Sequence, residues 1–429
     1  MRIQSALIGL FTLGAGLCEA APIIETSPVP QLRPSGQWVA FIPLPKLRPE
    51  AQAQPVAETG FSTWIAEFRG RALRSGIRGD VFDRAFRGIR YQSDVIARDR
   101  NQSEFSKTLW QYLDSAASDT RVANGRAALR DHARVLDAIE ARYGVDRNIV
   151  VAIWGLESAY GTFRGKTQVI PALATLAYDG RRGEFFEEQL IAALQIVQSG
   201  DTTVENMTGS WAGAMGHTQF IPTSYQAYAV DFTGDGRRDI WSDDPADALA
   251  STAAYLQNAG WIPGMPWGVE VQLPRGFDYR LADREQNRMP SDWARLGITD
   301  MSGRPVRDFG AASILVPAGA QGAAFMIFKN FSVIERYNAA DAYVIGVGHL
   351  ADRIKGGARI QSQWPRQDRA LTSAERKELQ ARLTRAGFDT QGVDGRIGPN
   401  TIAAVRSFQA RIGLVPDGYA SLEILRRLR

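Results

Sequence analysis

The chain has 429 residues, of which 45% are hydrophobic and 22% are charged. This length favours two or three domains, and this composition is typical of a globular protein and excludes disorder as the overall state. The 50 basic and 46 acidic residues leave a formal net charge of +4, so we expect a surface of mixed charge and no binding of nucleic acid.

The first 20 residues have the pattern of a secretory signal peptide. Met1 and Arg2 precede an apolar run over residues 3–17, and Cys18 and Ala20 supply small residues for a cleavage site. We expect cleavage after Ala20, export to the periplasm, and a mature chain without cysteine. The alternative is lipid attachment at Cys18 and anchoring to the outer membrane, although the preceding Leu17 is larger than such sites prefer.

Residues 21–59 are rich in proline, alanine and glutamine, which predicts an extended linker. From Phe61 onward, apolar residues recur at helical spacing. A helix is predicted over residues 124–143, stopped by Gly144. Another is predicted from an N-cap at Asp146 to about residue 158, ended by Gly161.

The second of these helices carries a glutamate, Glu157, in an apolar setting. Ile153 and Trp154 lie one helical turn before it and share its face. Burial and the helix C-terminus should both raise the pKa of this carboxyl, so that it stays protonated near neutral pH. Such a group can protonate a glycosidic oxygen. An ion pair with Arg142 or Arg164, or a solvated carboxylate, is the alternative.

Residues 209–225 form a glycine-spaced segment with polar and aromatic side chains between the glycines. Glycine lets the backbone approach a ligand closely. Ser210 and Gln219 could bind sugar hydroxyl or acetamido groups by hydrogen bonds. Flat faces for sugar rings could come from Trp211, Phe220 and Tyr225. A tightly packed loop is the alternative.

The next segment resembles the opening of an EF-hand calcium loop. Oxygen-bearing side chains alternate at Asp231, Thr233 and Asp235, and a glycine follows at the sixth position. The backbone carbonyl of Arg237 would supply the next ligand. The twelfth position is Ser242 instead of glutamate, so the pattern is incomplete. We expect a structural Ca²⁺; an Asp-Gly-rich turn that caps the next helix is the alternative.

The C-terminal part reads as a separate small domain. Residues 358–370 form a linker, and three short helices are predicted over 373–386, 399–411 and 420–428. The turn from Asp394 to Thr401 resembles that of the peptidoglycan-binding domain, so residues 371–429 are expected to be a three-helix module of this kind. A generic three-helix domain is the alternative.

Several motifs in the larger domain occur in a fixed order. They are Trp154-Gly-Leu-Glu157-Ser-Ala-Tyr-Gly161, Gly213-Ala-Met-Gly-x-x-Gln219-Phe220, Asp231-Phe-x-Gly-Asp-Gly236, and Arg336-Tyr-Asn338. Residues 61–357 therefore resemble the membrane-bound lytic murein transglycosylase B family. The resemblance implies a mainly α protein: a lysozyme-like α-helical catalytic core over residues 60–357, with a small β-subdomain at about residues 267–328.

The resemblance also implies roles for individual residues. It places the catalytic acid/base on Glu157, and substrate contacts on Ser210, Met215, Gln219, Tyr255, Tyr337, Asn338 and Tyr343. Phe185 stands where some members have tyrosine, so that hydrogen bond is missing while stacking on the ring remains available. A later aspartate closes the family's calcium site, and its counterpart here is Asp247.

The implied reaction is cleavage of the β-1,4 bond between N-acetylmuramic acid and N-acetylglucosamine in peptidoglycan. Glu157 would act first as acid and then as base, leaving 1,6-anhydromuramic ends. No cofactor is expected for catalysis, and we expect a monomer whose partners are glycan strands and other cell-wall enzymes. The alternatives are a hydrolytic muramidase and a non-catalytic peptidoglycan-binding scaffold. Three histidines and no mature cysteine argue against a zinc centre.

Overall fold

The computed structural model describes residues 54–100 and 107–429, with side chains from residue 60 onward. The predicted signal peptide and residues 21–53 of the predicted linker lie outside the described residues. Helix α1 (Gln54–Arg74) begins inside the segment that was predicted to be extended, so that prediction is wrong for residues 54–59. Pro55 lies in the first turn of α1, where proline costs no helical hydrogen bond.

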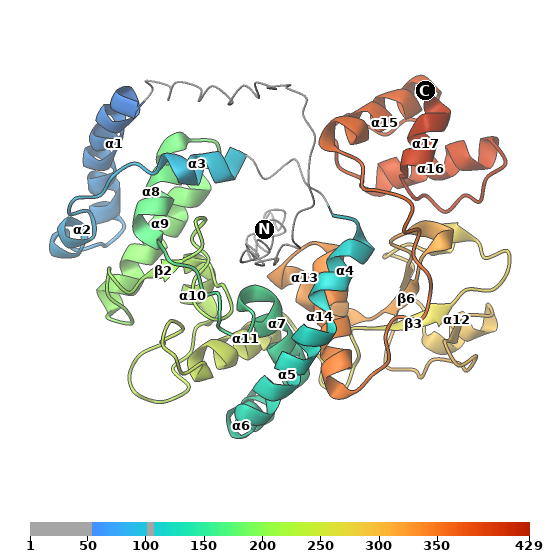
Figure 1. Cartoon of the computed structure of the whole chain (residues 1–429), viewed down its shortest axis with the longest axis horizontal. Helices are drawn as coiled ribbons and strands as arrows, with labels where there is room; N and C mark the ends of the chain where they lie inside the picture. The colour runs from blue at the N-terminus through green and yellow to red at the C-terminus, as the bar shows by residue number, and fades with distance from the viewer. Residues whose placement is uncertain (1–53, 101–106) are drawn as a thin grey trace, which may run out of the picture.

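The larger domain is a helical body with α7 (Arg147–Ser158) near its centre (Figure 1). On one side lie α1, α2 (Gly79–Ala85), α3 (Ser93–Arg100), α8 (Val169–Asp179) and α9 (Gly183–Ser199). The other helices are α4 (Leu109–Ala116), α5 (Asp119–Asp131), α6 (Ala133–Tyr143), α10 (Pro222–Tyr228), α11 (Ala246–Asn258), α13 (Lys329–Tyr337) and α14 (Asp341–Lys355). Helix α7 contacts α5, α6, α11 and α14, and one continuous apolar core joins both sides.

Helix α7 is the most buried of the elements that position the site. Ten of its twelve residues are buried, and only Arg147 and Glu157 are not. Asp146 caps its first turn, accepting a hydrogen bond from the backbone N–H of Asn148 at 2.8 Å, as the sequence predicts. Because its apolar residues occupy almost the whole circumference, α7 is fixed by packing on every side.

The single helix predicted over residues 124–143 is instead two helices. Helices α5 and α6 meet at His132, whose backbone leaves the helical region and serves as the C-cap of one and the N-cap of the other. The His132 ring packs edge-on against Trp154 of α7, with ring centroids 5.3 Å apart. This tertiary contact, which periodicity does not report, accompanies the bend. Gly144 ends α6 with a left-handed backbone (φ 68°), as predicted.

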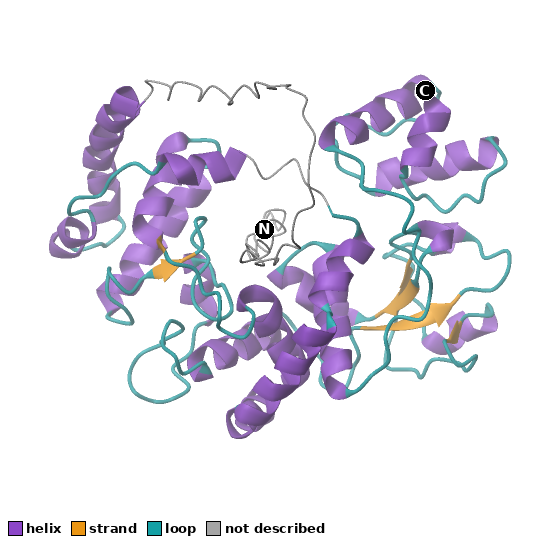
Figure 2. Ribbon diagram, in the orientation of Figure 1, coloured by secondary structure: helices purple, strands orange, loops and turns teal. Residues whose placement is uncertain are grey.

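A small antiparallel sheet lies within the segment predicted to contain the β-subdomain (Figure 2). Its strands, in the spatial order β4-β3-β6-β5, are β3 (Gly268–Gln272), β4 (Thr299–Asp300), β5 (Ser313–Leu315) and β6 (Ala324–Ile327). A second, two-stranded sheet pairs β1 (Thr167–Gln168) with β2 (Thr208–Gly209) in the larger domain. The four-stranded sheet and α12 (Pro290–Arg295) enclose an apolar cluster of their own around Trp293.

The C-terminal domain has the three helices that the sequence predicts. They are α15 (Ser373–Arg385), α16 (Pro399–Arg411) and α17 (Leu422–Leu428), and they surround a third apolar cluster. Thr372 and Glu375 form a capping box at the start of α15. None of the helices among residues 54–100 and 107–429 combines the length and the apolar character needed to cross a bilayer.

The segment between the two domains is held along its length by the larger domain. Glu270 of β3 accepts hydrogen bonds from the backbone N–H groups of Gln361 and Ser362. Trp364 stacks on Trp110 of α4, with centroids 6.2 Å apart. Arg366 forms a two-bond ion pair with Asp114 of the same helix, at 2.8 and 3.0 Å. The predicted linker is therefore a strap with a defined path.

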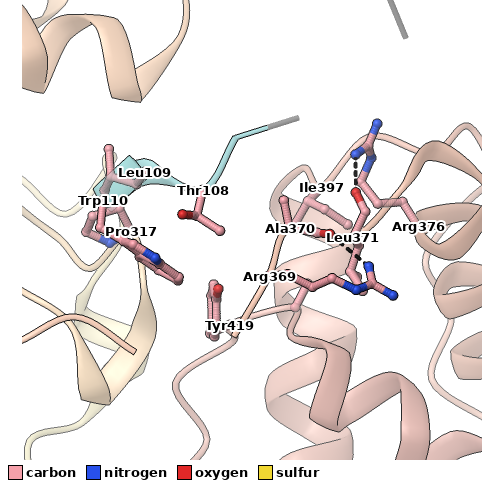
Figure 3. Close-up of a pocket in the computed structure, with 11 residues that line it drawn as sticks. Thr108, Leu109, Trp110, Pro317, Arg369, Ala370, Leu371, Arg376, Ile397 and Tyr419 are labelled. Carbon is pink, nitrogen blue, oxygen red and sulfur yellow. Dashed lines mark hydrogen bonds between the residues drawn. The ribbon is translucent and has the colours of Figure 1, made fainter. Parts of the chain in front are cut away.

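The C-terminal domain also contacts the β-subdomain directly. Asp417 accepts a hydrogen bond from the backbone N–H of Ala320 at 2.8 Å, and Arg406 donates one to the carbonyl of Ala282 at 3.0 Å. Between the domains lies a cavity of about 190 Å³ (Figure 3). It is lined by the start of α4, by Pro317, by the end of the strap, and by side chains of the C-terminal domain that include Tyr419.

Candidate active site

Glu157 lies in the last turn of α7, half-buried, and its partner comes from another helix. The hydroxyl of Tyr343, in the first turn of α14, donates a hydrogen bond to Oε1 of Glu157 at 2.6 Å. Tyr343 is itself 1% exposed. Helices α7 and α14 pack against one another, so the bond joins two elements that the core already holds together.

Burial raises the pKa of Glu157 from its ordinary value to about 7, and the hydrogen bond from Tyr343 opposes this rise. Removing water penalises the charged form of a carboxyl, whereas a donor stabilises that form. Since the first effect is the larger, a substantial protonated fraction exists at neutral pH. The sequence-based prediction of a raised pKa is confirmed, with desolvation as its main cause.

The alternative ion pairs of Glu157 are not formed. Arg164 donates to the carbonyls of Trp241 and Ser242 and pairs with Asp243 at 2.8 Å. The guanidinium of Arg142 lies over the rings of Tyr143 and Phe232. Neither cation contributes to the pKa of Glu157, whose shift arises from burial and from Tyr343 alone.

A second tyrosine connects this acid to the glycine-spaced segment. Tyr337, the last residue of α13, stacks on Tyr343 with ring centroids 6.5 Å apart and ring planes at 7°. Its hydroxyl donates to the carbonyl of Thr218 at 2.6 Å. Thr218 precedes Gln219, so the predicted sugar-binding segment and the acid are fixed to the same pair of stacked rings.

The glycine-spaced segment is a compact turn whose polar side chains already make some of their hydrogen bonds to backbone groups. The Ser210 hydroxyl accepts from the backbone N–H of Ala214 at 3.0 Å, which leaves its own proton free to be donated. Gln219 has a left-handed backbone (φ 56°), and its Nε2 donates to the carbonyls of Gly216 and Arg164. Both side chains are half-buried, and the Gln219 Oε1 stays available as an acceptor.

Several predicted substrate contacts prove to be buried. Met215 is 0% exposed and bonds through its backbone to Phe220, so it packs beneath the turn. The faces of Phe220 and Tyr225 are also buried, which makes the prediction that they stack on sugar rings wrong. Both rings belong to the main apolar core of the larger domain, whereas Trp211 is only half-buried.

The remaining predicted contacts lie around the two stacked tyrosines or on α9. Tyr255 of α11 is half-buried; its ring packs against Tyr337 at 5.0 Å, and its hydroxyl donates to the carbonyl of Arg336. Asn338 is buried and accepts from the backbone N–H of Ala340. Phe185 lies in the first turn of α9 with its ring edge-on to Phe186. Their contacts with substrate stay predictions.

His217 is a buried histidine of the glycine-spaced segment, and the sequence does not show which parts of the fold it connects. Its Nδ1 accepts from the indole N–H of Trp154 at 3.1 Å, and because tryptophan can only donate, this nitrogen carries no proton. Nε2 is then protonated and donates to the carbonyl of Ser242 at 2.8 Å. The Ser158 hydroxyl donates to the His217 carbonyl. This buried, neutral imidazole therefore joins the end of α7 to the segment of residues 231–247, called here the acidic loop.

The acidic loop brings together the carboxylates that the sequence predicted. One oxygen each from Asp231, Asp235 and Asp247 lies within 4.8 Å of the others. Burial raises the pKa of Asp247, whose two oxygens accept backbone N–H bonds from Phe232 and Asp239, among others. Three converging carboxylate oxygens are a donor set that suits Ca²⁺. These residues thus fit a cation, and Asp247 lies in the cluster, as the family resemblance implies.

A comparison with protein families decides which family this fold and site represent. The model of the Transglycosylase SLT domain matches residues 60–352. The chain belongs to the SLT transglycosylase family. A peptidoglycan binding domain model matches residues 372–428 of this SLT transglycosylase, so the C-terminal module is also confirmed.

Individual relatives agree with this assignment. The chain is 34% identical to membrane-bound lytic murein transglycosylase B of Escherichia coli K12 over 258 residues. The match covers 58% of this chain and 68% of that protein. It is also similar to Pseudomonas aeruginosa SltB3, crystallised with NAG-anhNAM-pentapeptide, at 49% identity and a TM-score of 0.84, covering 86% of this chain and 99% of that one. E. coli Slt35, crystallised with calcium, is 28% identical, with a TM-score of 0.57 and coverage of 71% and 93%.

These results confirm the predictions of enzyme class and of fold that were made from the sequence. The SLT transglycosylase is an enzyme, a lytic transglycosylase that acts on peptidoglycan. Its fold is mainly α, with a lysozyme-like core, a small β-subdomain and a C-terminal three-helix module. The non-catalytic scaffold is therefore no longer a candidate.

Proposed function

We propose that this enzyme cleaves the β-1,4 bond between N-acetylmuramic acid and N-acetylglucosamine and leaves 1,6-anhydromuramic ends, with Glu157 as the single acid and base. The observation that carries the proposal is the state of Glu157: half-buried, bonded to Tyr343, and with a pKa of about 7. SltB3 has been crystallised with both NAG-NAM-pentapeptide and NAG-anhNAM-pentapeptide, a substrate-like and a product-like ligand.

The proposed mechanism needs one group that first gives and then takes a proton. Protonated Glu157 donates its proton to the glycosidic oxygen as the bond to the anomeric carbon breaks. The resulting carboxylate then takes the proton of the muramic acid C6 hydroxyl as that oxygen attacks the anomeric carbon. Tyr343 donates to Oε1 throughout, and thereby stabilises the carboxylate between the two steps.

A single carboxyl favours this route over hydrolysis. Hydrolytic glycosidases usually use two carboxyl groups, the second acting as nucleophile or activating water. Within the described chain, no second carboxylate perturbs the pKa of Glu157. An internal hydroxyl nucleophile requires no activated water, so one residue suffices.

The test is mass spectrometry of purified sacculi digested with the enzyme and with Glu157→Gln. We expect anhydro ends, lighter by one water than reducing ends, from the wild type, and a loss of at least about a hundredfold in rate from the variant, since a general acid contributes about 10²–10⁴-fold. Glu188→Gln, at an exposed position of α9, is the matched control and should keep full activity. Reducing ends from the wild type would establish a muramidase instead.

We also propose that the acidic loop binds a structural Ca²⁺ through Asp231, Asp235 and Asp247, with Thr233 and the carbonyl of Arg237 as further ligands. The convergence of the three carboxylates supports this, as does the calcium complex of Slt35. The ion would offset the repulsion between these carboxylates and fix the loop that His217 holds against α7. Catalysis itself is proposed to need no cofactor.

For localisation, we propose export to the periplasm, directed by residues 1–20, and action there on glycan strands as a monomer. The relative in E. coli is named as membrane-bound. Determining the mass of the mature protein distinguishes cleavage after Ala20 from lipid attachment at Cys18.

A further inference from the structure

The loop that follows α7 connects the acid to the glycine-spaced segment. After Ser158 the backbone is left-handed at Ala159, Tyr160 and Gly161 (φ 48°, 59° and 82°). The backbone N–H of Phe163 then donates to the carbonyl of Ser158 at 2.9 Å. The chain therefore reverses tightly just beyond Glu157, and the next residues lie close to the end of the catalytic helix.

The same loop is fixed by contacts on its other side. Gln219 donates to the carbonyl of Arg164 at 3.1 Å, and the Arg164 guanidinium is bound by the carbonyls of Trp241 and Ser242. At Gly165 an added Cβ would lie 2.2 Å from the carbonyl group of Gly209, so the backbones are in direct contact. This loop has no room to move independently of the turn that carries Ser210 and Gln219.

Phe163 points out of this rigid loop. Its side chain is 59% exposed, more than any other large hydrophobic residue in the described part of the chain. Its ring makes no stacking or edge contact with another described aromatic ring, although most aromatic side chains here belong to such pairs. A phenyl ring held this way adds nothing to the core. Because the loop is already fixed, binding a ligand to the ring would cost little further conformational entropy of the backbone.

A continuous series of contacts connects the predicted substrate residues to the backbone next to Phe163. Glu157 bonds to Tyr343, Tyr343 stacks on Tyr337, and the Tyr337 hydroxyl holds the carbonyl that precedes Gln219. Gln219 in turn holds the carbonyl that follows Phe163. Phe163 is thus the neighbour in sequence of Arg164, whose carbonyl oxygen accepts a hydrogen bond from the predicted sugar-binding side chain of Gln219.

We propose that Phe163 is a further sugar-binding residue, whose ring stacks on a pyranose ring of the glycan strand at the edge of the active site. This inference rests on the proposed function, because it takes the glycan as the ligand. The face of a pyranose presents C–H groups, and an aromatic face offers them a flat, apolar partner that does not depend on the pattern of hydroxyl groups. The residue would bind and orient the strand; it would not take part in proton transfer.

The test measures binding separately from catalysis. Affinity for a tetrasaccharide of alternating N-acetylglucosamine and N-acetylmuramic acid is measured by calorimetry in a Glu157→Gln background, with Phe163 intact and with Phe163→Ala. Loss of the stacked ring should weaken binding about threefold to tenfold. Phe163→Trp should keep or improve the affinity. Leu296→Ala, which truncates a 42% exposed side chain in the β-subdomain, should leave it unchanged.

Activity assays on sacculi complete the test. With Glu157 present, Phe163→Ala should raise KM by a similar factor, with kcat within about twofold of the wild type, since the ring lies outside the proton-transfer step. Equal affinities for Phe163→Ala and its parent would overturn the inference while leaving the proposed function intact. A wild-type enzyme that yields no anhydro ends would instead refute the proposed function, whatever the affinities.

Discussion

At the scale of single residues, the proposed mechanism depends on two opposing effects at one carboxyl group. Burial raises the pKa of Glu157, and the Tyr343 hydroxyl lowers it, with a result of about 7. A higher pKa would give a weaker acid and a stronger base, and a lower pKa would leave little of the protonated form at neutral pH. A value near 7 suits a group that has to do both tasks in one turnover.

Substituting Tyr343 should change the pH dependence in a defined direction. The protonated acid disappears as pH rises through the pKa of Glu157, so the wild-type rate should fall above about pH 7. Tyr343→Phe removes the interaction that lowers this pKa, so the pKa should rise and the alkaline limb of kcat/KM should move to higher pH, by about one unit for a hydrogen bond to a charged group.

The measurement is a pH–rate profile on sacculi for the wild type, Tyr343→Phe and Tyr228→Phe. Tyr228 packs on the ring of Tyr255 and does not contact Glu157, so its variant controls for the loss of a phenol nearby. An alkaline limb that stays in place, or that moves to lower pH, in Tyr343→Phe would contradict the assigned role of this hydrogen bond.

At the scale of elements, α11 links the acidic loop to the active site. Asp247 lies in its first turn and closes the carboxylate cluster, while Tyr255, two turns later, packs against Tyr337. Helix α11 also contacts α7. Together with His217, which bonds to Trp154 and to the carbonyl of Ser242, it gives two physical routes from the acidic loop to the helix of Glu157.

Calcium should therefore stabilise the fold without entering the reaction. An ion that binds only the folded state at a hundred times its Kd adds about 2.7 kcal/mol to the free energy of unfolding. At about 2.1 cal/mol/K per residue, the unfolding entropy of a domain of roughly 290 residues is about 0.6 kcal/mol/K, so this free energy corresponds to a rise in Tm of about 4–5 °C. We expect millimolar Ca²⁺ to raise the Tm of the wild type, and a chelator to reverse the rise.

Asp235→Asn gives the sharper form of this experiment. Asp235 is exposed, and an asparagine can still accept the hydrogen bond from the backbone N–H of Arg237, so the loop should fold while the site loses one charge. The Ca²⁺-dependent rise in Tm should shrink or vanish. The control is Asp244→Asn. Asp244 accepts a hydrogen bond from the backbone N–H of Ala246 and lies outside the cluster, so this variant should keep the rise in Tm. A wild type that is indifferent to Ca²⁺ would refute the site.

The sequence could predict those elements whose signals are local. The cap at Asp146 marked the start of α7, and the alternating oxygens marked two of the three clustered carboxylates. The end of α7 was predicted at about residue 158, as observed, but its left-handed C-cap residue is Ala159 and not Gly161. Long-range contacts left no such signal: the break at His132 accompanies packing on Trp154, and Tyr343 is 186 residues from the carboxyl it bonds. Likewise, periodicity could not show that Phe220 is buried while Phe163 is exposed.

At the scale of the whole molecule, the strap determines how the binding module can serve catalysis. A flexible linker would let the module raise the local substrate concentration over a range of geometries. Here the strap is hydrogen-bonded to Glu270, stacked on Trp110 and ion-paired with Asp114, and the module itself is hydrogen-bonded to the β-subdomain through Asp417. The module is therefore presented at a fixed position relative to Glu157, which limits the glycan paths that can engage both domains.

Limited digestion with trypsin tests whether the strap is fixed. The strap contains Arg359, Arg366 and Arg369, each a cleavage site if the backbone is free. A protease needs an extended, mobile segment, and the bonded strap supplies one only by local unfolding. We expect wild-type enzyme to resist cleavage between the domains, and the double variant Trp364→Ala/Arg366→Ala, which removes the stack on Trp110 and the pair with Asp114, to be cut at Arg359 or Arg369.

The control is Arg69→Ala, which removes an exposed ion pair to Asp83 far from the strap and should leave the digestion pattern between the domains unchanged.

Release of the strap should also change the activity on the polymer. Turnover of a soluble tetrasaccharide, too short to span both domains, should be the same in the double variant and the wild type, whereas the rate on sacculi should change, because only the polymer can engage both domains at once. Rapid cleavage of the wild type at Arg359 or Arg369 would show instead that the module is flexibly tethered, and the rate on sacculi would then be insensitive to the double substitution.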